Sequence, residues 1–297
     1  MSNVLQAVPV AEPKTVDTRS RLTLWYVGAL LFLTAWLYSP ILVRLVRQWW
    51  SDPNFSHGFF VPLFSGYVLW QNRQQLASIA PKPSTWGLPV IVFSLLMLVV
   101  GTFGAELFLS RASLILLAAG MVIFFFGWVM LRAVFFPLAF LLLMVPIPAI
   151  VFDQITFPLQ ILASKLAAWT LPIFGVPVLR EGNVIYLPSM PLEVAQACSG
   201  IRSLMSLATL AIIYGYLLES RMWVRWTLAL ASVPIAMAAN GFRIVGTGLI
   251  VQYWDPEKAE GFFHLFSGWL IFVVSLFMLF GLHQIIKFFS SKWEPAS

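Results

Sequence analysis

Apolar residues run through the chain in long stretches that are separated by short polar ones. Eight stretches are long enough, at a rise of about 1.5 Å per residue, to cross about 30 Å of hydrocarbon as helices, or nearly so with tilt. They cover residues 22–43, 57–75, 86–104, 108–131, 133–151, 194–218, 223–250 and 262–287. The pattern predicts an all-α fold, a polytopic bundle of transmembrane helices.

Residues 152–175 leave two interpretations open. The segment is long enough for a ninth span, but it contains two prolines and has polar residues at positions 153, 154, 160, 164 and 165. These positions fall mostly at helical spacing, which is typical of an amphipathic helix lying in the membrane interface.

The charges between the apolar stretches favour the interfacial helix, because basic residues concentrate in cytoplasmic loops. With a cytoplasmic N-terminal tail and no crossing by 152–175, the inner side carries Arg73, Lys82, Arg132, Arg221, Arg225, Lys287 and Lys292. The outer side then carries Asp52, Glu106, Asp153 and the acidic segment 255–260, together with the basic residues Arg44, Arg47, Arg111 and Arg180. A crossing by 152–175 would invert every later loop. We therefore expect eight spans, one interfacial helix and two cytoplasmic termini.

The ends of the chain differ from its centre. Residues 1–21 are polar and lack the pattern of a signal peptide, so we expect a disordered cytoplasmic tail. A single transmembrane domain over 22–287 and a second cytoplasmic tail over 288–297 complete the organisation. Residues 176–193 have strand-like and turn character, with a turn signal at Glu181-Gly182-Asn183. The portion 176–268 is predicted to carry the chemistry.

Composition excludes a soluble globular domain. Hydrophobic residues make up 60% of the chain and charged residues 10%, whereas soluble domains average about 45–50% and about 25%. The net charge of +6 comes from single basic residues between apolar stretches, so membrane orientation explains it better than nucleic-acid binding does. Membrane lipids are the expected surroundings, and we predict no nucleic-acid partner.

Ionisable residues inside predicted spans cost free energy and mark functional candidates, and three of them stand out. Cys198 lies about one turn into the sixth span, where the helix N-terminus and Arg202 favour a reactive thiolate. Arg243 lies about two turns below the outer end of the seventh span, and Asn240 one turn earlier could orient it. His264, about one turn into the eighth span, suits proton transfer.

Each of the three also has an ordinary explanation: an inert buried thiol, an arginine that snorkels to the interface, and a histidine that packs or forms a hydrogen bond. The predicted topology, however, places them in the outer leaflet on three consecutive helices. A thiol, an imidazole and a guanidinium at one depth supply the nucleophile, the proton shuttle and the oxyanion stabiliser of acyl transfer. Cys198, Arg243 and His264 are therefore predicted to be catalytic.

The other histidines are weaker candidates. His57 opens the second predicted span, where we favour a structural helix start over a substrate contact. His283 lies at the cytoplasmic end of the last span and is expected at the interface. The histidines and the single cysteine do not fall at metal-ligand spacing, and no Walker loop, dinucleotide fingerprint or HExxH motif occurs. We predict no metal and no cofactor.

Four motifs follow one another along the chain: Trp50-Ser-Asp-Pro-Asn-Phe-Ser-His-Gly-Phe, Glu193-Val-Ala-Gln-Ala-Cys-Ser-Gly-Ile-Arg-Ser-Leu, Asn240-Gly-Phe-Arg-Ile and His264-Leu-Phe-Ser-Gly. On these motifs the chain resembles the exosortase family of bacterial membrane transpeptidases over about residues 35–285. The resemblance implies a multispan enzyme of the Gram-negative inner membrane, with its site toward the periplasm and a Cys–Arg–His constellation.

The resemblance also implies the substrates. Exported proteins would carry a C-terminal Pro-Glu-Pro motif, a transmembrane helix and a basic tail, and would pass through a thioester on Cys198 to an acceptor, a lipid or a polysaccharide, in exopolysaccharide or envelope biogenesis. Supporting or substrate-binding roles are expected for Glu193, Arg202, Asn240, Ser267, His57, Arg180 and Glu181.

Two other classes of function compete with an enzyme. A transporter or channel would use the buried arginine and histidine to line a polar path, but the chain shows no internal repeat of the kind transporters have. A non-catalytic scaffold for envelope assembly would tolerate the loss of Cys198.

Overall fold

The computed structural model describes residues 18–104, 106–194, 200–254 and 262–293, without the side chains of 18–24, 27, 262–267 and 291–293. Its contacts divide the chain into two units, Met1–Val43 and Arg44–Ser297. Helix α1 (Thr18–Ser51) begins in the first unit and ends in the second. All of the following contacts lie within the second unit.

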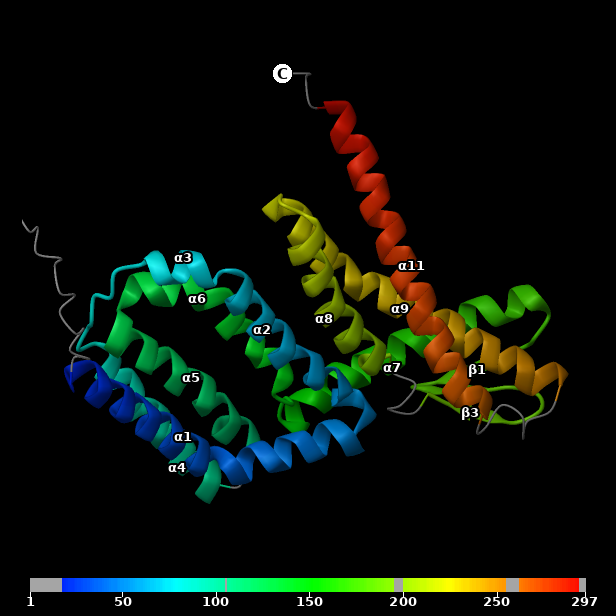
Figure 1. Cartoon of the computed structure of the whole chain (residues 1–297). Helices are drawn as coiled ribbons and strands as arrows, with labels where there is room; N and C mark the ends of the chain where they lie inside the picture. Colours follow the sequence, from blue (N-terminus) through cyan, green and yellow to red (C-terminus); the bar gives the residue numbers. More distant parts are fainter. Residues whose placement is uncertain (1–17, 105, 195–199, 255–261, 294–297) are drawn as a thin grey trace, which may run out of the picture. The chain divides into compact units, whose positions relative to one another are not determined.

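Helices dominate the structure and confirm the all-α membrane fold (Figure 1). Within the described part of the chain, six helices are long and apolar enough to cross a membrane: Gly28–Ser51, Leu107–Phe126, Ala149–Phe174, Ile201–Leu218, Met222–Tyr253 and Gly268–Ser290. Shorter apolar helices cover Gly87–Phe103 and Trp128–Met144. The predicted span 57–75 is a 3-10 helix η1 (Pro53–Phe59) followed by α2 (Phe60–Gln71) and α3 (Arg73–Ser78).

Helices α4 (Gly87–Phe103) and α5 (Leu107–Phe126) form a closely packed pair. Small residues allow the close approach, because Gly101 faces the backbone of Ser110 and Gly87 faces the backbone of Phe124. Small residues at helix contacts are typical of membrane bundles, where backbones pack tightly without a hydrophobic driving force.

The predicted boundary between the fourth and fifth spans, near residue 132, is wrong. Helix α5 ends at Phe126, and Gly127 adopts φ +85°, a backbone conformation that residues other than glycine rarely adopt. A Cβ at this position would also collide with the carbonyl oxygen of Lys82. The next helix, α6 (Trp128–Phe140), starts at once and continues into η2 (Leu141–Met144).

Helix α7 (Ala149–Thr170), followed by η3 (Leu171–Phe174), occupies the ambiguous segment. Its polar residues do not share one exposed face: Gln160 and Ser164 are buried, whereas Asp153 and Lys165 are exposed. The Ser164 hydroxyl has two acceptors, the carbonyl of Ile161 in the same helix and the carbonyl of Gly182, which explains a buried polar residue in an apolar helix. By length and composition the helix qualifies as a span.

The expected strand-like segment is a three-stranded antiparallel sheet of β1 (Leu179–Glu181), β2 (Val184–Tyr186) and β3 (Pro191–Glu193). Gly182, at φ +60°, makes the predicted turn between β1 and β2. The sheet packs on α7 and α9 through a core that includes Ile185, Ala167 and Ile244. The small sheet is the exception in an otherwise helical fold.

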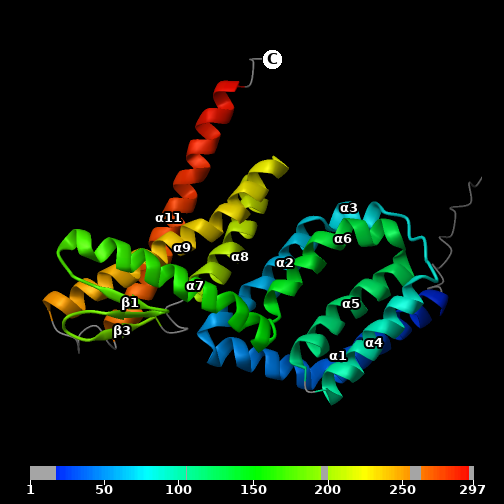
Figure 2. The same cartoon turned by 180° about the vertical axis from the view of Figure 1, so that it is seen from behind.

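The C-terminal part of the described chain contains helices α8 (Ile201–Leu218), α9 (Met222–Tyr253) and α11 (Phe262–Trp293). They lie side by side in Figures 1 and 2 and share a core that includes Leu207, Leu228 and Leu279. The predicted start of α8 at 194 is wrong, since β3 ends at Glu193 and Gly200, at φ +82°, is the N-cap. The α8 helix therefore begins after Cys198, and α11 continues past the predicted end at 287.

Candidate active site

A cavity of about 740 Å³ lies between η1, α2, α8, α9 and α11. Its lining combines two arginines and several hydroxyl groups with a larger number of apolar side chains. The described residues that line it are Ser56, His57, Phe60, Leu63, Phe64, Gly200, Arg202, Ser203, Ser206, Thr209, Leu210, Ile213, Arg243, Gly268, Trp269 and Phe272. Cationic and apolar side chains thus line the same cavity.

Gly200 and Asn240 bring two of the predicted motifs together. An ideal Cβ on Gly200 would lie 2.9 Å from Cγ of Asn240, and the Asn240 side chain is 2% exposed. The motif that contains Cys198 therefore packs directly on the motif that contains Arg243. Cys198 itself lies outside the described residues.

Arg243 is half-buried and lines the cavity from α9. Its Nη2 would lie 3.7 Å from a Cβ on Gly268 of α11. Position 264 belongs to α11, one helical turn before Gly268, so the helix carries the fourth motif past the guanidinium. The side chains of His264 and Ser267 lie outside the described part.

The first motif forms η1 and touches the cavity in two ways. His57 lines it, is 5% exposed, and its Nε2 lies 3.2 Å from the carbonyl oxygen of Leu143. Asn54 accepts a hydrogen bond at Oδ1 from Nε of Arg202, at 3.4 Å. His57 therefore helps to fix η1 against η2, as a structural helix start does, and it also borders the cavity.

The three predicted residues on the sheet lie elsewhere. Arg180 donates to the carbonyl of Gly182 within its own hairpin, and Glu181 is exposed at the end of β1. Glu193 ends β3 and borders a small hollow that Arg243 also borders. None of the three lines the large cavity.

Comparison with known proteins decides the family. The sequence model of the transmembrane exosortases matches residues 49–281, which include all four motifs. The chain belongs to the transmembrane exosortase family. No curated protein and no solved structure matches it. Membership supports a membrane transpeptidase role in the processing of sorting signals.

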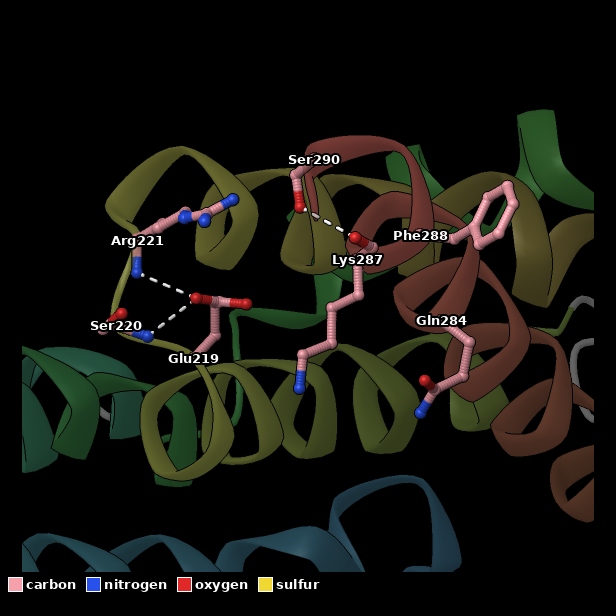
Figure 3. A pocket seen from close by; sticks show the side chains of 7 residues that line it. All are labelled: Glu219, Ser220, Arg221, Gln284, Lys287, Phe288 and Ser290. Carbon is pink, nitrogen blue, oxygen red and sulfur yellow. Dashed lines mark hydrogen bonds between the residues drawn. The ribbon is translucent and has the colours of Figure 1, made fainter. Parts of the chain in front are cut away.

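A second hollow, of about 660 Å³, lies in this exosortase at the ends of α8 and α11 that are remote from Arg202 (Figure 3). Its lining holds none of the predicted site residues: Glu219, Ser220, Arg221, Gln284, Lys287, Phe288 and Ser290. Backbone N–H groups of Arg221 and Ser220 donate to the Glu219 carboxylate (Figure 3). The hydrogen bond from Arg221 is the main reason why the pKa of Glu219 is below its usual value.

His283 is buried beside this hollow, with 2% of its surface exposed. Its Nδ1 lies 2.8 Å from the hydroxyl of Tyr214, and its Nε2 lies 3.3 Å from Oε2 of Glu219. The expected interfacial histidine is therefore a buried link between α8 and α11. It takes no part in the candidate active site.

Sequence reasoning missed several cavity residues of the exosortase. Ser203, Ser206 and Thr209 recur every three residues, which places them along one side of α8. Thr209 Oγ1 is buried and has no hydrogen-bond partner, which is unusual for a buried hydroxyl. The spacing of these three hydroxyl residues in the sequence could have predicted a polar face on α8. Across the described residues, no three His, Cys, Asp or Glu side chains come together as a metal site would require.

Proposed function

We propose that this exosortase is a cysteine transpeptidase that cleaves the C-terminal Pro-Glu-Pro sorting signal of exported proteins and transfers them to an acceptor. One observation carries the proposal: described residues next to each predicted catalytic residue border the same cavity. Gly200 and Arg202 follow Cys198, Arg243 borders the cavity itself, and Gly268 lies one turn after position 264.

In the first step, the Cys198 thiolate attacks the scissile carbonyl carbon, and Arg243 stabilises the negative charge that develops on its oxygen. Arginine suits this role because it stays charged in a poor dielectric, where charge stabilisation is stronger than in water. Protonated His264 gives its proton to the leaving amine as the peptide bond breaks. The product is a thioester between Cys198 and the exported protein.

In the second step, His264 accepts the proton of the acceptor's nucleophile, which attacks the thioester carbonyl. The carbon–sulfur bond breaks, and the Cys198 thiolate returns to its starting state. The acceptor is a lipid or a polysaccharide, consistent with a role in exopolysaccharide and envelope biogenesis. Asn240 and Gly200 support the site by holding the two motifs in contact.

The proposed location is the inner membrane of a Gram-negative bacterium, with the cavity toward the periplasm and both termini in the cytoplasm. Charge supports this orientation, because Arg221 and Arg225 lie beyond the end of α8 that is remote from Arg202. The apolar portion of the cavity, with Leu63, Leu210 and Phe272, suits the transmembrane helix of the substrate.

Co-expression with a signal-bearing protein tests the function. The wild-type enzyme should release the signal, and mass spectrometry should show a new C-terminus near the Pro-Glu-Pro motif, with a hydroxamate when hydroxylamine intercepts the thioester. Cys198→Ala should abolish both products while the variant stays as abundant in membranes as the wild type. Normal processing by this variant would reject the enzyme mechanism and favour a scaffold.

A further inference from the structure

The charged side chains among the described lining of the large cavity are all basic. Arg202 and Arg243 both line it, and no Asp or Glu occurs among the described lining residues. Most of the remaining lining is apolar, and opposite charge stabilises a cation more strongly where water is scarce. A cavity of this kind favours a ligand with an anionic group.

Arg202 stands at an unfavourable place for helix stability. It is the second residue of α8, near the positive end of the helix dipole, where a cation costs rather than contributes stability. An anion bound there would be stabilised by the helix terminus and the guanidinium together. The position therefore indicates binding rather than support of the helix.

Asn54 holds the guanidinium from one side. The Asn54 side chain accepts from Nε, and the Asn54 backbone N–H donates to Oδ1 of Asp52 at 2.9 Å, which fixes the start of η1. The hydrogen bond to Asn54 is the only one that Arg202 makes to the described residues, so its two terminal nitrogens remain for a ligand. A carboxylate fits them, since two parallel N–H groups bind its two oxygens.

Arg243 has different surroundings. Its guanidinium lies beside Gly268 on the helix that carries position 264, and Glu193 borders the adjoining small hollow. Arg243 thus lies beside the helix that carries position 264 and shares a hollow with a carboxylate. The Arg202 guanidinium instead donates to a neutral amide, that of Asn54. The two arginines are suited to two different anionic groups.

We propose that Arg202 is the residue that selects the substrate: its guanidinium binds the glutamate carboxylate of the sorting signal, and Asn54 is its positioning residue. This inference rests on the proposed function and deepens it. It also assigns signal recognition to the first turn of α8 instead of Arg180 and Glu181, which lie on the hairpin outside the cavity.

A charge exchange between enzyme and substrate tests the assignment. Wild-type enzyme, Arg202→Gln and Arg202→Glu are each co-expressed with signals that carry Glu, Gln or Arg at the central position of the Pro-Glu-Pro motif. The wild type should process the Glu signal about tenfold or more faster than the Gln signal, the usual size of a lost charged hydrogen bond. Arg202→Gln should remove this preference, and Arg202→Glu should process the Arg signal faster than the wild type does.

Asn54→Ala should reduce the same Glu-to-Gln preference partly, and Arg132→Gln, an exposed arginine of α6, should leave it unchanged. If Arg202→Gln slows the Glu and Gln signals by one common factor, Arg202 acts on the chemistry or the fold, and the assignment is rejected. If the wild type cleaves none of the signals, the proposed function itself is rejected. A gain for the exchanged pair could not arise from misfolding.

Discussion

Gly200 and Asn240 are in direct contact, and the contact leaves no room for a side chain at position 200. A Cβ there would lie 2.9 Å from Cγ of Asn240, closer than real Cβ atoms approach their neighbours. Gly200 also adopts φ +82°, a conformation that costs another residue about 1–2 kcal/mol. The segment that follows Cys198 thus depends on a glycine to reach the α9 helix.

Gly200→Ala should therefore lower signal processing about tenfold or more, because both the strain and the clash disturb the contact of Gly200 with Asn240 on the helix that carries Arg243. Processing is measured by the fraction of co-expressed substrate that loses its signal. Gly246→Ala is the matched control on α9, since no atom lies within 4 Å of a Cβ there. Equal processing by both variants would contradict the proposed role of the contact.

Arg243→Lys tests whether geometry as well as charge matters at this position. A lysine keeps the charge but loses the planar fork of N–H donors, so we expect at least a tenfold loss of processing rather than the small change that charge alone implies. Arg132→Lys on the exposed surface of α6 is the control. Near-normal turnover of Arg243→Lys would show that a point charge is sufficient.

The approach of α11 to Arg243 gives a graded test at Gly268. A Cβ would make an ordinary contact with Nη2 at 3.7 Å, so Gly268→Ala should be tolerated. Gly268→Leu should displace the guanidinium and lower processing strongly. Gly281→Leu on the same helix meets open space and should stay active. The same activity for Gly268→Leu and Gly281→Leu would place the guanidinium elsewhere.

Trp49, near the end of α1 and directly before the first motif, anchors α1 to η2, and its loss should destabilise the protein. The indole Nε1 donates to the carbonyl of Met144 at 2.9 Å, and the side chain is 6% exposed. Trp49→Phe keeps most of the apolar surface but leaves a buried carbonyl unpaired, at a cost of about 1–3 kcal/mol. Thermal unfolding in detergent should show a lower midpoint for this variant than for Trp50→Phe, whose side chain is 84% exposed.

Much of the fold could be predicted from local patterns. Apolar stretches of sufficient length predicted α5, α8, α9 and α11, and the turn signal at Gly182 predicted the hairpin. The helix boundaries at Gly127 and Gly200 were missed, because an apolar stretch does not reveal which glycine adopts a left-handed conformation. Such a conformation depends on the packing partner, Lys82 in one case and Asn240 in the other.

In the candidate site, too, short sequence motifs could be recognised in advance, whereas contacts between residues far apart in the sequence could not. The motifs drew attention to Arg243 and Arg202, and both of these residues line one cavity. The hydrogen bond between Asn54 and Arg202 joins residues 148 positions apart and results from tertiary packing alone. The polar residues of α7 were expected at a surface, yet Ser164 is buried, with one acceptor in its own helix at Ile161 and one in the distant hairpin at Gly182.

The Glu219–His283–Tyr214 chain predicts how stability depends on pH. The Glu219 carboxylate accepts from backbone N–H groups, and these hydrogen bonds hold its pKa below the usual 4.5. A group with a lowered pKa in the folded state stabilises the fold above its unfolded pKa, and this contribution is lost as the pH falls through the folded value.

Glu219→Gln should therefore be less stable than the wild type at pH values above about 4.5, with the difference shrinking as the solution is acidified below that value. Unfolding midpoints of both proteins in detergent, measured across this range, give the difference directly, and other acidic groups cancel because both proteins share them. In a His283→Phe background, a second substitution at Tyr214 should change the unfolding midpoint much less than it does in the wild type, since the side chains of His283 and Tyr214 form a hydrogen bond with each other. A difference between wild type and Glu219→Gln that stays constant with pH would show that ionisation of the carboxylate does not stabilise the fold, and would leave the hydrogen bond between Tyr214 and His283 as the polar link between α8 and α11.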